Sequence, residues 1–221
     1  MSRTEHGSIY AVRWRVLIPV KPADDAKSRL RGATRHVSDH PELVRALQAD
    51  TIAAVAAAAR LSDSIAGVHL IGDGTDWIRQ IAVRELELLA DPGGGLNAAL
   101  SVGAAHLAAM APPTGVIAVL ADLPALQPAE FLAVLERAAH VERGFVPDAE
   151  GTGTTMLAVS AGLALKPAFG LDSAHRHRES GAVELQAGPG ARTDVDTADD
   201  LRRCLELGVG VHTLAVAALY R

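Results

Sequence analysis

The stretch RWRVLIPVKPADDAKSRL, residues 13–30, begins as an apolar run and changes at Pro19 into a charged loop. The apolar part is typical of a strand that is buried on both faces of a parallel sheet. The loop behind it carries Lys21, Lys27 and Arg29, and these two lysines are two of only three in the chain. A buried strand that leads into a cationic loop favours an α/β protein that binds an anion at the end of this strand.

The rest of the chain alternates strand patterns with helix patterns. Further strands are predicted at residues 65–72, 85–91, 115–122, 143–148, 153–160 and 182–186, and helices at 38–61, 75–83, 96–110, 127–139, 172–181 and 197–208. This order predicts an α/β fold with a mostly parallel sheet and helices on both faces. The strands at 143–148 and 153–160 are close enough in sequence to form a small antiparallel excursion. We expect a single domain over residues 1–221, with residues 1–14 as a flexible N-terminal segment.

The composition limits the class of protein. With 221 residues, 49% of them hydrophobic, the chain can bury a sizeable core. A formal net charge of −5 and an aromatic content of 3% argue against a nucleic-acid partner. No apolar run reaches the roughly 18 to 20 residues that cross a bilayer, and the N-terminus lacks the apolar core of a secretory signal. We therefore expect a soluble, cytoplasmic protein without a membrane partner.

The cationic loop is the first candidate site. Lys21, Lys27 and Arg29 can neutralise a polyphosphate, but the lysines can also pair with Asp24 and Asp25 in a solvated loop. The stretch contains neither a Walker A motif nor GxGxxG. A P-loop ATPase and a standard dinucleotide-binding fold are therefore disfavoured.

A glycine-rich loop, DPGGGLN at residues 91–97, precedes a predicted helix. Glycines such as Gly94 and Gly95 have no Cβ, so a bulky ligand can approach the backbone closely. Asn97 offers both a donor and an acceptor to a base or a ribose. A plain strand-to-helix turn explains the glycines equally well.

Three aspartates are the candidate metal ligands. Asp122 ends the predicted strand at 115–122, and Asp194 and Asp196 have the spacing that places two extended residues on one side. An all-carboxylate set suits Mg²⁺, which takes oxygen ligands and keeps several waters. We assign Asp199 and Asp200 instead to the first turn of the last predicted helix, where negative charge is favourable.

A second group of polar residues lies in the C-terminal half of the sequence. Thr154, Thr155, Gly170 and Ser173 are placed to hold a small anion such as a phosphate. The histidines of the HRH segment are not at i, i+4 spacing, which argues against zinc and for a positive rim or a solvated helix face. The single cysteine, in a predicted helix, is assigned to packing and excludes an intrachain disulfide. The apolar tail at 211–221 is either a last strand or part of a homodimer contact.

Six segments occur together in this order: IPVKPADDAKSRL, DPGGGLN, ADLPAL, GTGTTML, FGLDSAHRH and DVDTADDL. Together they resemble the 2-phospho-L-lactate or phosphoenolpyruvate guanylyltransferases that make the deazaflavin coenzyme F-420. The resemblance covers residues 16–207. It implies a nucleotidyltransferase fold of the glycosyltransferase-A type and a reaction that joins GTP to a phosphorylated three-carbon acid with release of pyrophosphate. It also implies an unstable product that is handed to the next enzyme of the pathway.

The resemblance also implies roles for individual residues. It assigns the acceptor acid to Thr155, Gly170 and Ser173, and Mg²⁺ to Asp122, Asp194 and Asp196. It assigns the triphosphate of GTP to the cationic loop with Lys21, Lys27 and Arg29, and the guanosine to Gly94, Gly95 and Asn97. In this interpretation Lys27, Arg29 and Asp122 are catalytic, because they offset the charge on the reacting phosphates.

Three alternatives stay open from the sequence. One is a related nucleotidyltransferase for another nucleotide or acceptor, such as a molybdopterin or a sugar phosphate. Another is a catalytically silent subunit that only binds nucleotide, against which the complete set of three aspartates argues. The last is an unrelated α/β domain with ordinary loops.

Overall fold

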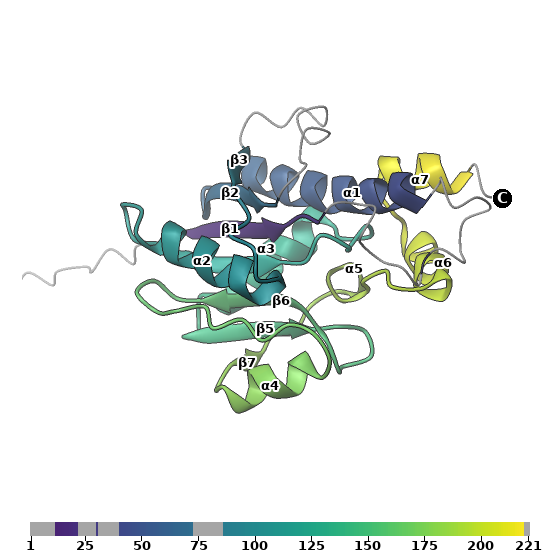
Figure 1. Cartoon of the computed structure of the whole chain (residues 1–221). Coiled ribbons are helices and arrows are strands. Elements are labelled where there is room, and N and C mark those ends of the chain that lie inside the picture. The colour runs from purple at the N-terminus through teal and green to yellow at the C-terminus, as the bar shows by residue number, and fades with distance from the viewer. Residues whose placement is uncertain (1–11, 22–29, 31–39, 73–85, 219–221) are drawn as a thin grey trace, which may run out of the picture.

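The computed structural model describes residues 12–21, 30, 40–72 and 86–218. The described strands form one seven-stranded sheet in the order β3-β2-β1-β4-β6-β5-β7 (Figure 1). They are β1 (Trp14–Pro19), β2 (Ile65–Ile71), β3 (Leu86–Leu89), β4 (Gly115–Val119), β5 (Arg143–Pro147), β6 (Thr154–Val159) and β7 (Val183–Glu184). β3, β2, β1 and β4 are parallel, whereas β6 is antiparallel to both of its neighbours, β4 and β5. The expected α/β fold with an antiparallel excursion is confirmed.

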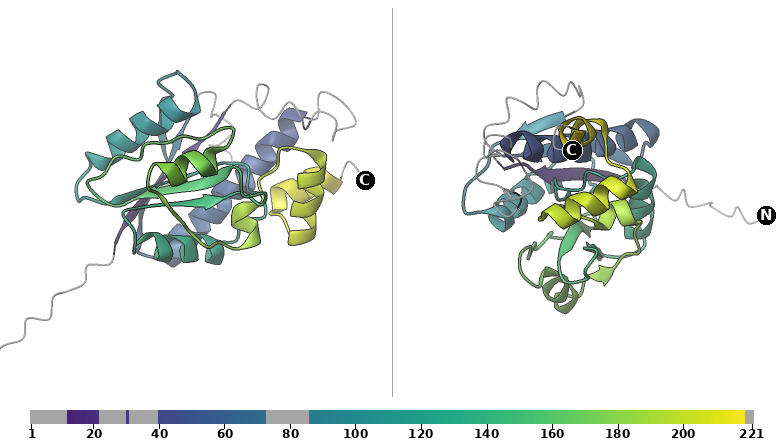
Figure 2. Two further views of the ribbon diagram at one scale, coloured as in Figure 1. Left: turned by 90° about the horizontal axis from the view of Figure 1, so that it is seen from below. Right: turned by 90° about the vertical axis from the view of Figure 1, so that its right-hand side faces the viewer.

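Helices cover both faces of the sheet. They are α1 (His40–Leu61), α2 (Leu96–Ala108), α3 (Pro128–Ala138), α4 (Ser173–Glu179), α5 (Pro189–Arg192), α6 (Ala198–Leu207) and α7 (Val211–Ala218). α1 and α3 pack on one face and α2 and α4 on the other, while α5, α6 and α7 gather beyond the carboxyl end of β1 (Figures 1 and 2). None of the helices in the described ranges combines the length and the apolar character that a membrane crossing requires. The helix predicted at 75–83 lies outside the described residues.

β1 is buried at every position because it lies in the middle of the sheet. Val16 and Ile18 point into the core beneath α1 and α3, and Leu17 points into the core beneath α2. From Val16 to Ile18 both faces of β1 are therefore apolar, as the opening run predicts. Trp14, assigned above to a flexible segment, is the first residue of β1 and is 1% exposed; residues 1–11 lie outside the described part.

Local hydrogen bonds define where two helices start. In α3, Gln127 and Glu130 form a capping box, and in α6 Thr197 and Asp200 form another. The Thr197 hydroxyl accepts a hydrogen bond from the Asp200 amide, and the Asp200 carboxylate accepts one from the Thr197 amide (2.8 Å). Such reciprocal bonds satisfy amides that the first turn leaves open. The assignment of Asp200 to helix capping is confirmed.

Cys204 is a packing residue of α6. Its thiol is fully buried and donates a weak hydrogen bond to the carbonyl of Thr193 (3.4 Å). Burial, together with the nearby carboxylates of Asp194, Asp200 and Asp122, raises the pKa of the thiol to about 12. A thiol in this environment stays protonated and unreactive at physiological pH.

Residues 211–218 of the C-terminal tail form helix α7, so the alternative of a last strand is wrong for this part. α7 packs against α1, and Val216 and Ala217 are buried there. Asp50 of α1 is 4% exposed, and its two carboxylate oxygens accept hydrogen bonds from the amides of His212 (3.0 Å) and Thr213 (2.8 Å). Asp50 thus caps α7 from another helix, which supplies the acceptors that the start of any helix needs. The homodimer contact stays a prediction.

We expect Asp50→Ala to lower the free energy of unfolding by about 1–2 kcal/mol, because two amides at the start of α7 lose their acceptor. Chemical denaturation of both variants and the parent measures this. Asp63→Ala is the control, since Asp63 is exposed and follows the same helix. Equal stabilities for the two variants would show that Asp50 does not hold α7 in place.

Candidate active site

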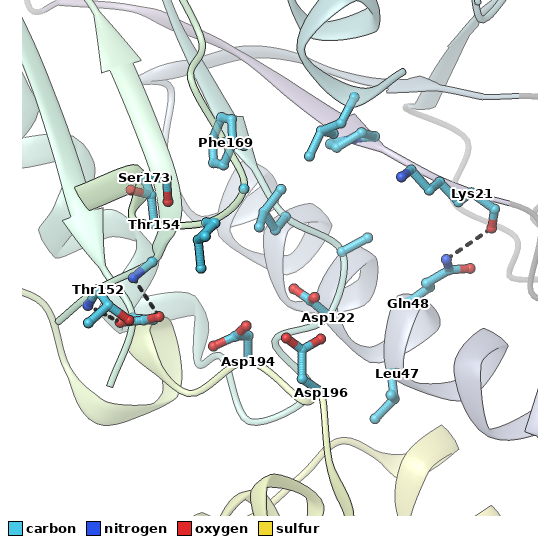
Figure 3. Close-up of a pocket in the computed structure, with 18 of the residues that line it drawn as sticks. Lys21, Leu47, Gln48, Asp122, Thr152, Thr154, Phe169, Ser173, Asp194 and Asp196 are labelled. Carbon is cyan, nitrogen blue, oxygen red and sulfur yellow. Dashed lines mark hydrogen bonds between the residues drawn. The ribbon is translucent and has the colours of Figure 1, made fainter. Parts of the chain in front are cut away.

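A pocket of about 640 Å³ lies at the carboxyl ends of β1 and β4. Parallel sheets bind their ligands at this end of the strands. Loops at 148–153, 169–173 and 194–196 complete its wall (Figure 3). The polar lining residues are Lys21, Gln48, Asp122, Asp148, Thr152, Thr154, Asp172, Ser173, Asp194 and Asp196, and the others are Pro19, Val44, Leu47, Leu96, Leu120, Ala121, Gly153, Phe169, Gly170 and Leu171.

The carboxylates of Asp122, Asp194 and Asp196 converge between the end of this pocket that carries Ser173 and the end that carries Lys21 (Figure 3). Each offers an oxygen, and these three oxygens lie within 4.8 Å of one another. Asp122 and Asp194 are half-buried and Asp196 is exposed. Three like charges at this separation repel each other, and a divalent cation with oxygen ligands relieves that repulsion. The chemistry and the spacing of the donors fit Mg²⁺.

Backbone hydrogen bonds bring the three aspartates together. The amide of Val195 donates to the carbonyl of Asp122 (3.1 Å), so the segment at 194–196 lies directly beside the end of β4. The amide of Leu123 donates to the Thr51 hydroxyl of α1 (2.9 Å), which fixes the other side of Asp122. Val195 is fully buried, and its two flanking aspartates line the pocket.

A second acidic group, Asp148, Glu150 and Asp194, also has oxygens within 4.8 Å of one another. Two of its members make structural contacts. The Asp148 carboxylate accepts hydrogen bonds from the amides of Thr152 (2.9 Å) and Gly153 (2.7 Å), and so closes the turn before β6. Glu150 pairs with an arginine of α6 at 2.8 Å. These contacts favour a structural role for this group.

The end of the pocket that lies opposite Lys21 carries hydroxyl donors (Figure 3). Thr154 at the start of β6 is 4% exposed, and Ser173 at the start of α4 is 2% exposed. Between them the loop turns at Gly170, whose φ of 116° is a conformation that side chains with a Cβ rarely adopt. Hydroxyl groups in a half-enclosed wall can bind the oxygens of a small anion without bringing a counter-charge.

Three side chains fix the loop at 168–173. Asn97 of α2 donates to the carbonyl of Phe169 (3.0 Å) and accepts from its amide (2.8 Å). Arg176 of α4 donates to the carbonyl of Ala168 (3.0 Å), and His177 accepts from the Ala168 amide (3.0 Å). The loop that forms one wall of the pocket is therefore fastened from two helices.

His177 itself is fully buried beneath this wall and contacts the Phe169 ring edge-on, with centroids 5.3 Å apart. Its Nδ1 lies 2.9 Å from the Thr154 hydroxyl. Burial, with smaller contributions from Arg143 and Arg176, lowers the pKa of His177 to about 4. The ring is therefore neutral at physiological pH. The expectation that this histidine lies on a positive rim or a solvated face is wrong.

Lys21 faces the pocket from the side opposite Thr152 and Ser173 (Figure 3). Its carbonyl accepts a hydrogen bond from the Gln48 side chain (3.1 Å), which ties the end of β1 to α1. Lys21 as a whole is exposed, so its side chain is accessible to a ligand. Lys27 and Arg29, the other cations of this loop, lie outside the described residues.

Seven of the predicted site residues line this one pocket: Lys21, Asp122, Thr154, Gly170, Ser173, Asp194 and Asp196. Four others lie next to it. Gly94 and Gly95 adopt φ values of 80° and 89° in the turn before α2, and Asn97 has its amide on the Phe169 backbone. Thr155 is fully buried, and its hydroxyl donates to the carbonyl of Ala191 (2.7 Å). The binding roles assigned to all eleven stay predictions.

Gln48, Thr152 and Phe169 line the pocket without having been predicted from sequence. Gln48 lies in the middle of a long helix, where nothing marks one buried polar residue as part of a site. Thr152 belongs to the turn closed by Asp148. The alternation of glycine and threonine in this turn could have indicated a binding loop.

The fold belongs to a known class of enzymes. A solved nucleotidyl transferase from Methanothermobacter thermautotroptrophicus superposes with a TM-score of 0.59 over 88% of this chain and 97% of that chain, at 17% identity. The molecule therefore has a nucleotidyltransferase fold, as the resemblance implied.

Residues 14–214 match the family described as "Guanylyl transferase CofC like", so the chain belongs to this family. It is 48% identical to a Streptomyces coelicolor protein named phosphoenolpyruvate guanylyltransferase, over 94% of this chain and 97% of the relative. A Streptomyces avermitilis protein of the same name is 46% identical, over 94% of this chain and 95% of the relative.

We expect Mg²⁺ or Mn²⁺ to raise the melting temperature of the parent protein, by an amount equivalent to about 1.4 kcal/mol at ten times the dissociation constant. In Asp194→Asn this shift should disappear, and the metal-free variant should melt above the metal-free parent because one repelling charge is gone. Asp199→Asn, which removes an exposed carboxylate of α6, is the control and should keep the shift. A full metal shift in Asp194→Asn would contradict the assignment.

Stability should fall as the pH is lowered from about 6.5 to about 4, because the unfolded chain binds a proton at His177 before the folded chain does. Protonation of this residue lowers the free energy of unfolding by up to about 3 kcal/mol at low pH, and it has no effect above pH 6.5. Denaturant titrations across this range measure it. In His177→Asn, which cannot titrate, the pH dependence should be shallower; an unchanged slope would refute the neutral buried ring.

Proposed function

We propose that this chain joins GMP from GTP to the phosphate of phosphoenolpyruvate and releases pyrophosphate. The observation that carries the proposal is one pocket that combines three converging carboxylates with a lysine on one side and neutral hydroxyl donors on the other, in a chain of this family. The named relatives direct the choice of phosphoenolpyruvate over 2-phospho-L-lactate as the acceptor.

The reaction needs no general base. An anionic oxygen of the acid's phosphate attacks the α-phosphorus of GTP, a new P–O–P bond forms, and the bond to the β-phosphate breaks. Both reactants are anions, so the barrier arises largely from bringing them together in line. Positioned cations and donors are therefore the groups that this reaction requires.

The nucleotide is proposed to occupy the side of the pocket at the end of β1. Lys21 lies there, and the chain continues from it into the loop that carries Lys27 and Arg29. These three cations offset the negative charge that builds on the departing pyrophosphate. The guanosine is assigned to the neighbouring glycine loop, with Gly94 and Gly95.

The acid is proposed to occupy the opposite side, against Gly170 and Ser173. Thr154 takes the place that the resemblance gave to Thr155, because the Thr155 hydroxyl is buried and donates to the carbonyl of Ala191. The left-handed backbone at Gly170 shapes this wall, and two hydroxyls face the acid from it. Phe169 lies beside them and offers an apolar surface to the carbon skeleton of the acid. A small anion with a short apolar part matches these donors.

Between the two sides, Asp122, Asp194 and Asp196 would hold Mg²⁺. When bound, the ion supplies positive charge to the phosphate oxygens and lowers the repulsion between the two anionic substrates. The carboxylates are held in place by the backbone bond between Val195 and Asp122. Their role is to position the charge at the point where the two substrates meet.

The product contains a pyrophosphate link between an enol phosphate and GMP, and such a link is activated for transfer. The class of enzyme that consumes it transfers the phospho-acid to a hydroxyl and releases GMP. We assign this step to the biosynthesis of the deazaflavin coenzyme F-420, with direct hand-off of the product to that enzyme.

Pyrophosphate release tests the function. The chain is incubated with Mg²⁺, GTP and, in turn, phosphoenolpyruvate, 2-phospho-L-lactate or 3-phosphoglycerate, with ATP and CTP as nucleotide controls. We expect release only with GTP and phosphoenolpyruvate. Release only with 2-phospho-L-lactate would reassign the acceptor, and GTP binding without any release would favour a silent nucleotide-binding subunit.

We expect Lys21→Gln to lower kcat/KM for GTP by about 10- to 100-fold, because a cation near the triphosphate is lost. Lys166→Gln is the matched control, because Lys166 is exposed and does not line the pocket. Steady-state kinetics at saturating phosphoenolpyruvate measure both variants. An equal effect of the two substitutions, or none, would remove Lys21 from the nucleotide side.

A further inference from the structure

The hydroxyl of Thr154 and the ring of His177 form a hydrogen-bonded pair directly beneath the pocket wall. His177 Nδ1 and Thr154 Oγ1 are 2.9 Å apart, and the other ring nitrogen, Nε2, lies 3.0 Å from the amide nitrogen of Ala168. His177 is fully buried and Thr154 is 4% exposed, so the surroundings fix both groups. Thr154 nevertheless lines the pocket.

The contact with Ala168 decides the tautomer of His177. A backbone amide can only donate, so Nε2 must accept and carries no hydrogen. The ring is neutral, and its single N–H is therefore on Nδ1. This N–H points at Thr154 Oγ1, which must accept.

The direction of that hydrogen bond decides what Thr154 can do. A threonine hydroxyl has one hydrogen to donate and two lone pairs that accept. Because His177 donates to the oxygen, the hydroxyl hydrogen stays available, and no other partner of Oγ1 is found among the described residues. In the other tautomer Thr154 would donate to Nδ1 and would have no hydrogen left for a ligand.

We propose that His177 is a positioning residue that sets Thr154 as a hydrogen-bond donor to an anionic oxygen of the acceptor acid. This inference rests on the function proposed above, because it assigns a residue that binds the acceptor acid of that reaction. Thr154 is adjacent to Ser173 at the same end of the pocket, away from Lys21 (Figure 3). The pair therefore contributes to recognition of the acid and not of the nucleotide.

The same loop links the pair to the rest of the wall. Ala168, which fixes the tautomer, precedes Phe169, and Asn97 holds the Phe169 backbone on both sides. Arg176 binds the Ala168 carbonyl. The amide of Ala168 is thus held in position. Because this amide donates to Nε2, it also keeps the ring hydrogen of His177 on Nδ1.

Steady-state kinetics of Thr154→Val test the proposal. This substitution keeps the shape of the side chain and removes the hydroxyl. We expect KM for phosphoenolpyruvate to rise about 10- to 100-fold while KM for GTP changes by less than about 3-fold, as for one lost hydrogen bond to a charged group. Thr154→Ser should restore most of the affinity. Ser160→Ala removes a hydroxyl just beyond the other end of β6, where it binds the Val141 carbonyl, and is the matched control.

Two substitutions separate the two nitrogens of His177. An asparagine at this position has its side-chain amide near the place of Nδ1, so it can still donate a hydrogen bond to the Thr154 hydroxyl. A glutamine has its side-chain amide near the place of Nε2, so it can only accept the hydrogen bond from the Ala168 amide. We expect His177→Gln to raise KM for phosphoenolpyruvate more than His177→Asn does. In the Thr154→Val background His177→Gln should add little, because both act through the same hydroxyl.

The protonation of the ring is measured independently of activity. The ¹⁵N and ¹H NMR signals of the His177 ring in the uniformly labelled, full-length chain should report Nδ1–H and an unprotonated Nε2 at neutral pH. An Nε2–H tautomer, or an unchanged KM for the acid in folded Thr154→Val, would overturn the inference. A parent protein that releases no pyrophosphate would instead refute the proposed function, while the NMR result would still decide the tautomer.

Discussion

The convergence of three carboxylates at the end of β4 is the constraint on which the pocket depends. Asp122, Asp194 and Asp196 repel one another, yet the backbone bond between Val195 and Asp122 holds them within reach of a single ion. The free energy that keeps them together comes from elsewhere, from a buried central strand and from helices that bury both faces of the sheet. The burial of the core thus offsets the unfavourable repulsion between the aspartates. Such local destabilisation is common at functional sites.

Around this acidic centre the two halves of the pocket differ in kind. The end of β1 presents a cation, Lys21, to a region suited to a polyphosphate. The opposite end presents the hydroxyls of Thr154 and Ser173 instead, and the loop at 168–173 that forms this wall is held by Asn97, Arg176 and His177. This arrangement suits a site that must align two anions. One substrate meets a cation, the other meets hydroxyl donors, and the metal ligands lie between them.

Much of this arrangement was predictable because it depends on local patterns. The continuous apolar run predicted a central parallel strand, and the carboxyl-end rule placed Asp122 and its partners at one site. The parts that were not predictable depend on distant contacts. α7 is capped by Asp50, 162 residues away from His212, and Asn97 binds Phe169 across 72 residues. An isolated sequence pattern could not show that the Asn97 amide binds the Phe169 backbone, nor distinguish the buried His177 from a histidine on a helix face.

The proposed arrangement of metal, nucleotide and acid is tested most directly by a crystal structure with Mn²⁺ and a non-hydrolysable GTP analogue, in which anomalous scattering locates the metal. We expect Mn²⁺ within bonding distance of Asp122, Asp194 and Asp196, with the triphosphate on the Lys21 side and the Thr154–Ser173 end left open for the acid. A metal bound elsewhere, or a triphosphate against Thr154 and Ser173, would contradict the division of the pocket on which the proposed reaction depends.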